Sequence, residues 1–300
     1  MNGDAFRTRE GRLRLGWRLT LYAVLLLALT VWLATSLPPT LAWSSLALLT
    51  AALISGWTLL ALDGRSPAAL GFTLGGEAPL ATMSGFGLGS AVFLSGILLV
   101  ALVGGVRWVS EPGSPGAFLA SGGVALGVLA VPAAAEEALL RGYPLQALSE
   151  AWGPATALLL TSAAFGLLHI GNPEVSWVGI TNTATAGLFL GALYLRTGSL
   201  WWTTGAHLGW NWTQGFLLDL PVSGVDVANA PWIKGTAVGS EVLSGGAFGP
   251  EGSVLVTGAL VCAAAWVWRT PRLTPTPAAR AVPPLARLRE RSSRPVVENT

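Results

Sequence analysis

Charged and polar side chains interrupt apolar segments at three places in this 300-residue chain. Glu136 and Glu137 end one apolar run and are followed by Arg141, while the only two histidines, His169 and His207, lie in later apolar runs. An ionisable group in the middle of such a run costs roughly 2.5–3.5 kcal/mol to insert into a bilayer. We therefore expect these residues to carry the chemistry of the protein.

Helical spacing predicts different roles for the two glutamates. Glu137 and Arg141 are four residues apart, so in a helix they share a face and can form an ion pair. Glu136 points about 100° away around the helix axis. This predicts that Arg141 neutralises Glu137, and that Glu136 is free for proton transfer. The simpler interpretation is that the cluster marks the end of a membrane span, with Arg141 reaching towards the headgroups.

The histidine segments repeat the four-residue spacing. His207 and Asn211 present two hydrogen-bond donors in one direction, and Phe165 lies on the same helical face as His169. A lone histidine in an apolar helix is more often a packed core residue. Here, however, both histidines of the chain lie in apolar segments, and an acidic pair lies on a third. This combination favours a shared polar site.

Composition indicates which elements position these residues. Hydrophobic residues make up 52% of the chain and charged residues 11%, with a mean hydropathy of +0.60, whereas soluble domains carry about 25% charged residues. A helix needs about 20 apolar residues to cross a bilayer and satisfies its own backbone hydrogen bonds. The expected fold is all-α, a polytopic helical membrane protein with about eight transmembrane helices. The segments are 19–36, 41–62, 84–106, 112–135, 151–173, 175–195, 197–218 and 252–268.

Charge distribution indicates orientation and domain organisation. Five arginines precede the first apolar segment and seven follow the last one, and basic flanks stay in the cytoplasm. We expect a basic cytoplasmic tail at 1–16, an integral membrane domain at 17–269 and a Pro/Arg-rich, disordered cytoplasmic tail at 270–300. The acidic loop 219–251 is placed outside, with no assigned role. The single cysteine, Cys262, excludes an intrachain disulfide.

The three motifs together resemble a known family. In order, and on three apolar segments, they read Glu136-Glu137-x-x-x-Arg141, Phe165-x-x-x-His169 and His207-x-x-x-Asn211. This pattern is similar to the CPBP family (CAAX proteases and bacteriocin-processing proteins), which includes type II CAAX prenyl endopeptidases and bacterial Abi proteins. Residues 187–200 are also similar to the family's stretch before its third motif. The resemblance covers about residues 118–217, the expected protease core.

The resemblance implies an intramembrane endopeptidase that hydrolyses a peptide bond of a membrane-associated or lipid-modified protein or peptide. Glu136 and His169 would position and deprotonate the attacking water. His207 and Asn211 would stabilise the tetrahedral oxyanion.

The remaining motif residues would have supporting roles. Glu137 and Arg141 would support the first helix through their ion pair, and Phe165 belongs to the second motif. Members of this family have often been classed as metalloproteases, and Glu136 with the two histidines would be the ligands of a zinc ion. The spacing is not the His-Glu-x-x-His arrangement on one helix, so the metal-free site is favoured and zinc stays open as the alternative cofactor.

The expected partners are the lipid bilayer and a membrane-anchored protein or peptide substrate, with no nucleic acid. Arginine use with a single lysine, and many alanines and glycines, point to a GC-rich bacterial source and to the bacterial cytoplasmic membrane. Bacteria do not normally offer prenylated CAAX proteins, so bacteriocin processing, self-immunity and maturation of a membrane peptide stay open. The alternatives are a non-proteolytic membrane factor of the same fold, such as a bacteriocin immunity or scaffold protein, and a small proton-coupled transporter. A transporter predicts internal repeats, and the sequence shows none.

Overall fold

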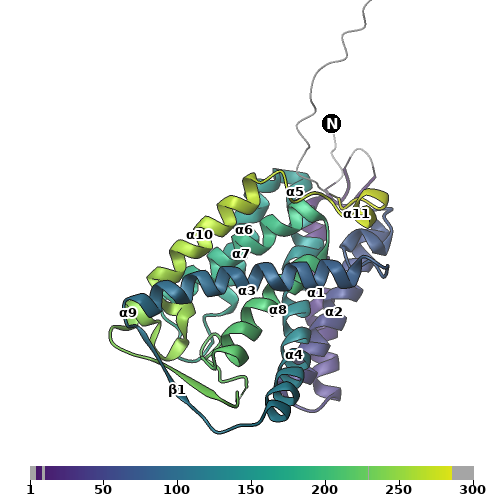
Figure 1. Cartoon of the computed structure of the whole chain (residues 1–300). Helices are drawn as coiled ribbons and strands as arrows, with labels where there is room; N and C mark the ends of the chain where they lie inside the picture. The colour runs from purple at the N-terminus through teal and green to yellow at the C-terminus, as the bar shows by residue number, and fades with distance from the viewer. Residues whose placement is uncertain (1–4, 9–10, 229, 286–300) are drawn as a thin grey trace, which may run out of the picture.

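A computed structural model describes residues 5–8, 11–228 and 230–285, which fold into a helical bundle with one small sheet (Figure 1). The α-helices are α1 (Leu15–Ser36), α2 (Leu41–Leu62), α3 (Ala78–Leu102), α4 (Pro115–Glu137), α5 (Tyr143–Trp152), α6 (Pro154–Leu168), α7 (Trp177–Thr197), α8 (Leu200–Trp212), α9 (Glu241–Ser244), α10 (Val254–Arg269) and α11 (Pro277–Ala281). A π-helical turn follows α4 at Ala138–Gly142, and another follows α8 at Thr213–Leu217. Short 3-10 helices lie at Pro67–Leu70, Gly246–Phe248 and Pro250–Gly252.

Each of the eight expected apolar segments corresponds to a helix, namely α1–α4, α6–α8 and α10. Within the described chain, five helical runs are long and apolar enough to cross a bilayer: Leu15–Ser36, Leu41–Leu62, Ala78–Leu102, Pro115–Trp152 and Trp177–Thr197. Two apolar helices are shorter, α6 with 15 residues and α10 with 16. The helical fold is thus confirmed, and the count of eight spans stays a prediction.

A two-stranded sheet, which the sequence analysis did not anticipate, is added to the helical fold in the described part of the chain. Strands β1 (Val106–Ser110) and β2 (Ile233–Ala237) pair antiparallel, at the end of the molecule far from the N-terminus (Figure 1). The third apolar segment was expected to be helical to residue 106, but α3 ends at Leu102. Gly104 follows with a φ of 74°, a left-handed conformation that favours glycine. The β-branched and aromatic side chains after it suit a strand.

Four glycines bring α3 and α8 into backbone contact. Gly85 and Gly89 on α3 face the α8 backbone, and Gly205 and Gly209 on α8 face the α3 backbone. Each pair has the four-residue spacing of closely packed membrane helices. A Cβ atom on Gly89 would lie 1.8 Å from the carbonyl oxygen of Ala206. This contact fixes α8, the helix that carries the third motif.

The helix of the first motif is longer than expected. It continues through Pro132 and, by way of the π-helical turn Ala138–Gly142, forms one run of 38 residues from Pro115 to Trp152. Pro144 follows that turn, and its nitrogen cannot donate to the carbonyl oxygen four residues earlier. Despite this proline, the segment 143–152 extends the helix of the first motif.

An ionic cluster ties α1 to α2 and α5 near the N-terminus. Arg18 contacts Asp63 at 2.7 Å and Glu150 at 2.8 Å, and donates to the Tyr143 hydroxyl at 2.6 Å. Arg12 contacts the same two carboxylates, at 3.1 and 2.8 Å. The basic N-terminal segment is thus part of the packed structure from Arg12 onward.

The expectation of a disordered C-terminal tail does not hold for residues 270–285. Ala279 on α11 is 3% exposed, and the Leu285 backbone N–H donates to the Gln146 side chain at 2.8 Å. Buried apolar side chains and hydrogen-bonded backbone groups hold this segment against the bundle. The rest of the expected tail, residues 286–300, lies outside the described residues.

Candidate active site

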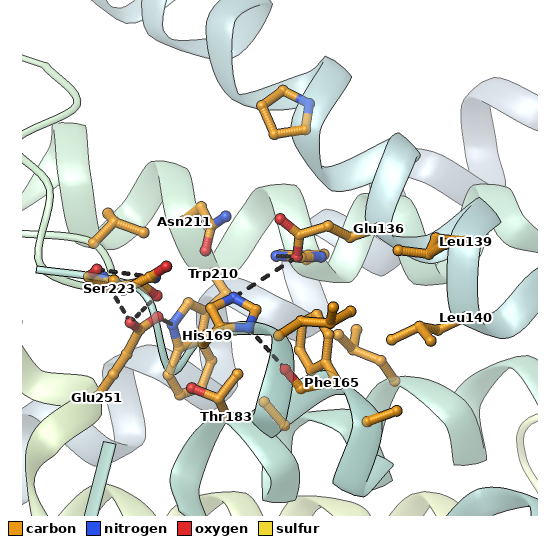
Figure 2. A pocket seen from close by; sticks show the side chains of 18 of the residues that line it. Glu136, Leu139, Leu140, Phe165, His169, Thr183, Trp210, Asn211, Ser223 and Glu251 are labelled. Carbon is orange, nitrogen blue, oxygen red and sulfur yellow. Dashed lines mark hydrogen bonds and ion pairs between the residues drawn. The ribbon is translucent and has the colours of Figure 1, made fainter. Parts of the chain in front are cut away.

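Three side chains of the motifs meet at one point between α4, α6 and α8. The Glu136 Oε2 atom lies 4.0 Å from His169 Nε2 and 3.8 Å from His207 Nε2. Figure 2 shows Glu136 and His169 facing each other across this gap. Among the described residues, the buried Oε2 atom has no hydrogen-bond partner. A carboxylate oxygen with free acceptor capacity therefore faces two imidazole nitrogens.

The course of the chain explains how Glu136 and His169 reach the same depth. Glu136 precedes Gly153 by 17 residues, and His169 follows Gly153 by 16. Gly153 has a φ of 84° and turns the chain from α5 directly into α6. Because the two helices run back along each other from this turn, the two side chains return to the same level. An earlier turn, as the eight expected segments implied, would place them at different depths.

The His169 ring is fixed by its own helix. Its Nδ1 atom lies 2.8 Å from the Phe165 carbonyl oxygen, which can only accept a hydrogen bond. The proton is therefore on Nδ1, and the lone pair of Nε2 faces Glu136. Four-residue spacing thus orients the second motif as well as the first.

Glu137 serves two partners inside the protein. Its Oε1 atom accepts from Arg141 Nη1 at 3.2 Å and lies 3.1 Å from His207 Nδ1. Glu137 and Arg141 are both fully buried, and the guanidinium lies 4.3 Å above the centre of the Phe165 ring. The ion pair predicted from the sequence forms, and it also orients the histidine of the third motif.

Asn211 lies one helical turn beyond His207 and lines the same cavity (Figure 2). Its side-chain amide forms no hydrogen bond with another described residue, so its donors are available to a ligand. The π-helical turn after it is anchored to α3, because Thr213 Oγ1 donates to Ser90 Oγ at 2.8 Å.

These polar groups open into a cavity of about 1080 Å³. Most of its wall is apolar and comes from α1, α2, α4, α6 and α7, with side chains such as Leu26, Leu41, Leu129 and Leu168. Mostly apolar cavities with a few convergent polar groups are typical of ligand-binding sites. This one can take an extended apolar segment of a peptide or a lipid chain.

Several polar residues of the cavity were missed by sequence reasoning, among them Glu251 and Ser223. Glu251 and Ser223 come from the loop 219–251, for which only an outer location was expected. Burial raises the pKa of the Glu251 carboxyl, and hydrogen bonds from Ser223 and Trp210 and the nearby His169 act against that rise. The sequence carried little signal, because an acidic residue in a loop is ordinarily solvated.

Comparison with known proteins agrees with the motifs. Residues 118–213 match the family model described as type II CAAX prenyl endopeptidase Rce1-like. The matched segment contains all three motifs and nearly coincides with the expected core, 118–217. Neither a search of curated proteins nor a search of solved structures gave a match. Over residues 118–213, this integral membrane protein therefore resembles the type II CAAX prenyl endopeptidases of the CPBP family, as its three motifs indicated.

Proposed function

We propose that this protein is an intramembrane endopeptidase that hydrolyses a peptide bond of a membrane-associated or lipid-modified protein or peptide. One observation carries the proposal: the unpartnered Glu136 Oε2 atom faces the Nε2 atoms of His169 and His207 inside an apolar cavity. This is the arrangement that a bound, attacking water needs.

The first step uses Glu136 and His169. Their facing atoms are 4.0 Å apart, a gap that one water can bridge with hydrogen bonds of about 2.8 Å to each side. Glu136 takes a proton from this water as its oxygen attacks the scissile carbonyl carbon. His169 holds the water through Nε2, because its Nδ1 proton is held by the Phe165 carbonyl.

The second step breaks the peptide bond. The carbonyl oxygen becomes an oxyanion, and the protonated Glu136 gives its proton to the leaving nitrogen as the carbon–nitrogen bond breaks. The products are a carboxylic acid and an amine, and the acid loses its proton to Glu136 or His169. The same carboxylate thus acts as base and then as acid.

His207 and Asn211 stabilise the oxyanion. To donate from Nε2, the His207 ring must carry protons on both nitrogens, and the Glu137 carboxylate beside Nδ1 supports that cation. Asn211 supplies the second donor through its side-chain amide. A preorganised donor in such a site is worth about 10²- to 10³-fold in rate.

The donor set of Glu136, His169 and His207 is also one that zinc accepts. Glu136 Oε2 lies 4.0 Å from His169 Nε2 and 3.8 Å from His207 Nε2, longer than the distance of about 3.4 Å between ligand atoms of a tetrahedral zinc ion. Among the described residues, no group of three such side chains is placed to hold a metal ion without rearrangement. The Nδ1 contacts of both histidines are of the kind that orients metal ligands. A bound zinc ion would supply a Lewis acid. We favour the metal-free site, because Glu136 Oε2 alone provides a base for the water.

The bacterial cytoplasmic membrane, with both termini in the cytoplasm, stays part of the proposal. In Figure 1, the N-terminus and α11 lie at the same end of the bundle, as an even number of spans requires. Described basic residues near both chain ends, such as Arg12 before α1 and Arg280 in α11, lie there, which supports a cytoplasmic location for that end.

The test is cleavage of a library of membrane-anchored peptides by purified protein in lipid. Wild type is compared with Glu136→Ala, His169→Ala and His207→Ala, each with and without a chelator. Glu111→Ala is the matched control, because Glu111 is an exposed carboxylate outside the cavity. We expect at least about 10²-fold slower cleavage in the three variants, full activity in the control and no effect of the chelator.

Other outcomes have distinct meanings. Loss of activity with the chelator and recovery with zinc would establish the metal-dependent form of the reaction. Equal cleavage by wild type and Glu136→Ala, or none by either, would contradict the proposal and favour the non-proteolytic membrane factor.

A further inference from the structure

Glu251 is a second carboxylate in the cavity, and the proposed hydrolysis does not use it. It lies in the 3-10 helix Pro250–Gly252, at the end of the long loop before α10. Figure 2 shows Glu251 on one side of the His169 ring and Glu136 on the other. The surface that Glu251 exposes lines the cavity. Glu251 therefore lies in the same cavity as the groups that would hold the water.

Only neutral groups donate hydrogen bonds to Glu251. Trp210 Nε1 donates to Oε1 at 3.0 Å, and Ser223 donates to Oε2 from its backbone nitrogen at 2.8 Å and its hydroxyl at 2.6 Å. Within the described chain, Glu251 forms no ion pair with a lysine or arginine. The donors orient the carboxylate, but they leave its negative charge without a cationic partner, which is costly where water is scarce.

His169 acts on Glu251, but in the proposed site its ring carries a single proton, on Nδ1, so the other groups of the cavity supply no permanent cation. Among the described residues that line it, the ionisable ones are Glu136, Glu251, His169 and His207, and none is a lysine or arginine. The nearest buried cation, Arg141, is already paired with Glu137. A substrate whose free carboxylate entered this cavity would add another negative charge beside two glutamates. A substrate cation would instead compensate Glu251.

We propose, on the basis of the peptidase function above, that Glu251 selects peptide substrates that carry a positively charged group close to the scissile bond. The group is an ammonium or a guanidinium, supplied by a lysine or arginine side chain or by a free amino terminus. Glu251 is thus a specificity-determining residue, and its role is distinct from that of Glu136.

Glu251 also holds the turn at Ser223, so a purely structural role must be separated from charge recognition. Ser223 has a φ of 49°, and its turn is fastened from the other side by Asn172, whose side chain donates to the Ser223 carbonyl oxygen at 3.2 Å. Ser223→Ala removes one donor to Glu251 and keeps the charge. Glu251→Gln removes the charge and keeps the size. The two variants therefore weaken the same contact and differ in electrostatics.

The probes are fluorescent peptides with one apolar membrane anchor and a short polar segment. A single position, moved along the segment, is lysine, its neutral analogue norleucine, or glutamate. Further arms compare free with acetylated amino termini, and free with amidated carboxyl termini, which separates the sources of charge. Binding to the full-length protein in lipid is measured by anisotropy, and cleavage is measured separately by mass spectrometry.

At the best position, we expect wild type and Ser223→Ala to bind the lysine peptide about 10- to 100-fold tighter than the norleucine peptide, as for a hydrogen bond between charged groups. Glu251→Gln should bind the two equally. Equal binding by wild type at every position, or a preference that persists in Glu251→Gln, would overturn the proposal.

Failure of this inference and failure of the peptidase function give different results. Glu136-dependent cleavage without any charge preference would remove the role of Glu251 and leave the peptidase standing. A Glu251-dependent preference without Glu136-dependent cleavage would keep the cation-binding site and refute the peptidase.

Discussion

Replacing Glu137 with glutamine should separate the stability of this protein from its activity. Glu137 and Arg141 are both fully buried, and the glutamate oxygen that binds Arg141 also contacts His207 Nδ1. Glutamine keeps the size of the side chain and an acceptor oxygen. The change therefore removes one negative charge and little else.

The expected loss of stability follows from Arg141, which Glu137→Gln leaves buried without its carboxylate partner. Arg141 would keep its position over the Phe165 ring and its 3.4 Å contact with the Gly187 carbonyl, but its charge would have no carboxylate. Breaking a buried ion pair on one side costs about 3–5 kcal/mol. Cleavage should also fall by about 10²-fold, because the His207 cation that faces the oxyanion loses its support.

A double variant distinguishes the two effects. Glu137→Gln with Arg141→Met removes both charges, and the loss of both partners is often close to neutral for stability. Unfolding free energies in detergent, followed by tryptophan fluorescence, should show a loss in the single variant and recovery of most of it in the double variant. Cleavage should stay low in both.

Two results would refute this reasoning. If Glu137→Gln alone lost less than about 1 kcal/mol, the buried pair would not be the strong contact that its burial implies. If the double variant recovered cleavage together with stability, Glu137 would act only through Arg141 and not on His207.

Three further predictions follow from the helix contact and the cavity. Gly89→Ala should destabilise the protein and lower cleavage, because its Cβ atom would overlap the backbone of α8. Gly87→Ala, which has open space at its Cβ position, is the control and should be neutral or stabilising by up to about 1 kcal/mol. Equal unfolding free energies for the two variants would contradict the close contact. Asn211→Ala should lower kcat about 10²-fold with little change in KM, and a change confined to KM would show that the amide binds substrate rather than the oxyanion. Burial raises the pKa of Glu251, so this carboxylate becomes ionised only at a higher pH than an exposed glutamate. The preference for lysine over norleucine peptides should therefore be present at high pH and be lost as the pH falls through the raised pKa. His169 is the neighbouring titratable group that acts on Glu251. Peptide binding measured over a pH titration that starts at about 4.3, the ordinary pKa of a glutamate, and rises from there checks this; a preference that does not change with pH would contradict it.

Much of the fold could be read from the sequence, because it depends on local properties. Apolar runs of helical length fold as helices whatever lies next to them, and each expected segment does so. The ends of the helices depend on single residues, and these were less predictable. At Gly104 the chain leaves the helix for a strand, whose partner lies more than 120 residues further along the chain.

The candidate site also has features that the sequence predicts and features that depend on the tertiary structure. The sequence by itself determined which residues share a helical face, namely Glu137 with Arg141, Phe165 with His169 and His207 with Asn211, because four-residue spacing fixes those directions. It also determined that charges inside apolar helices need partners.

Only the tertiary structure decided which helices supply those partners. It placed Glu136 level with His169 through the turn at Gly153, and the packing of α8 brought His207 to both glutamates. It also brought Glu251 into the cavity from a loop that the sequence left without a role. The physical reason is that each of these contacts joins residues far apart in the chain, and their proximity depends on how whole helices pack rather than on spacing along one of them.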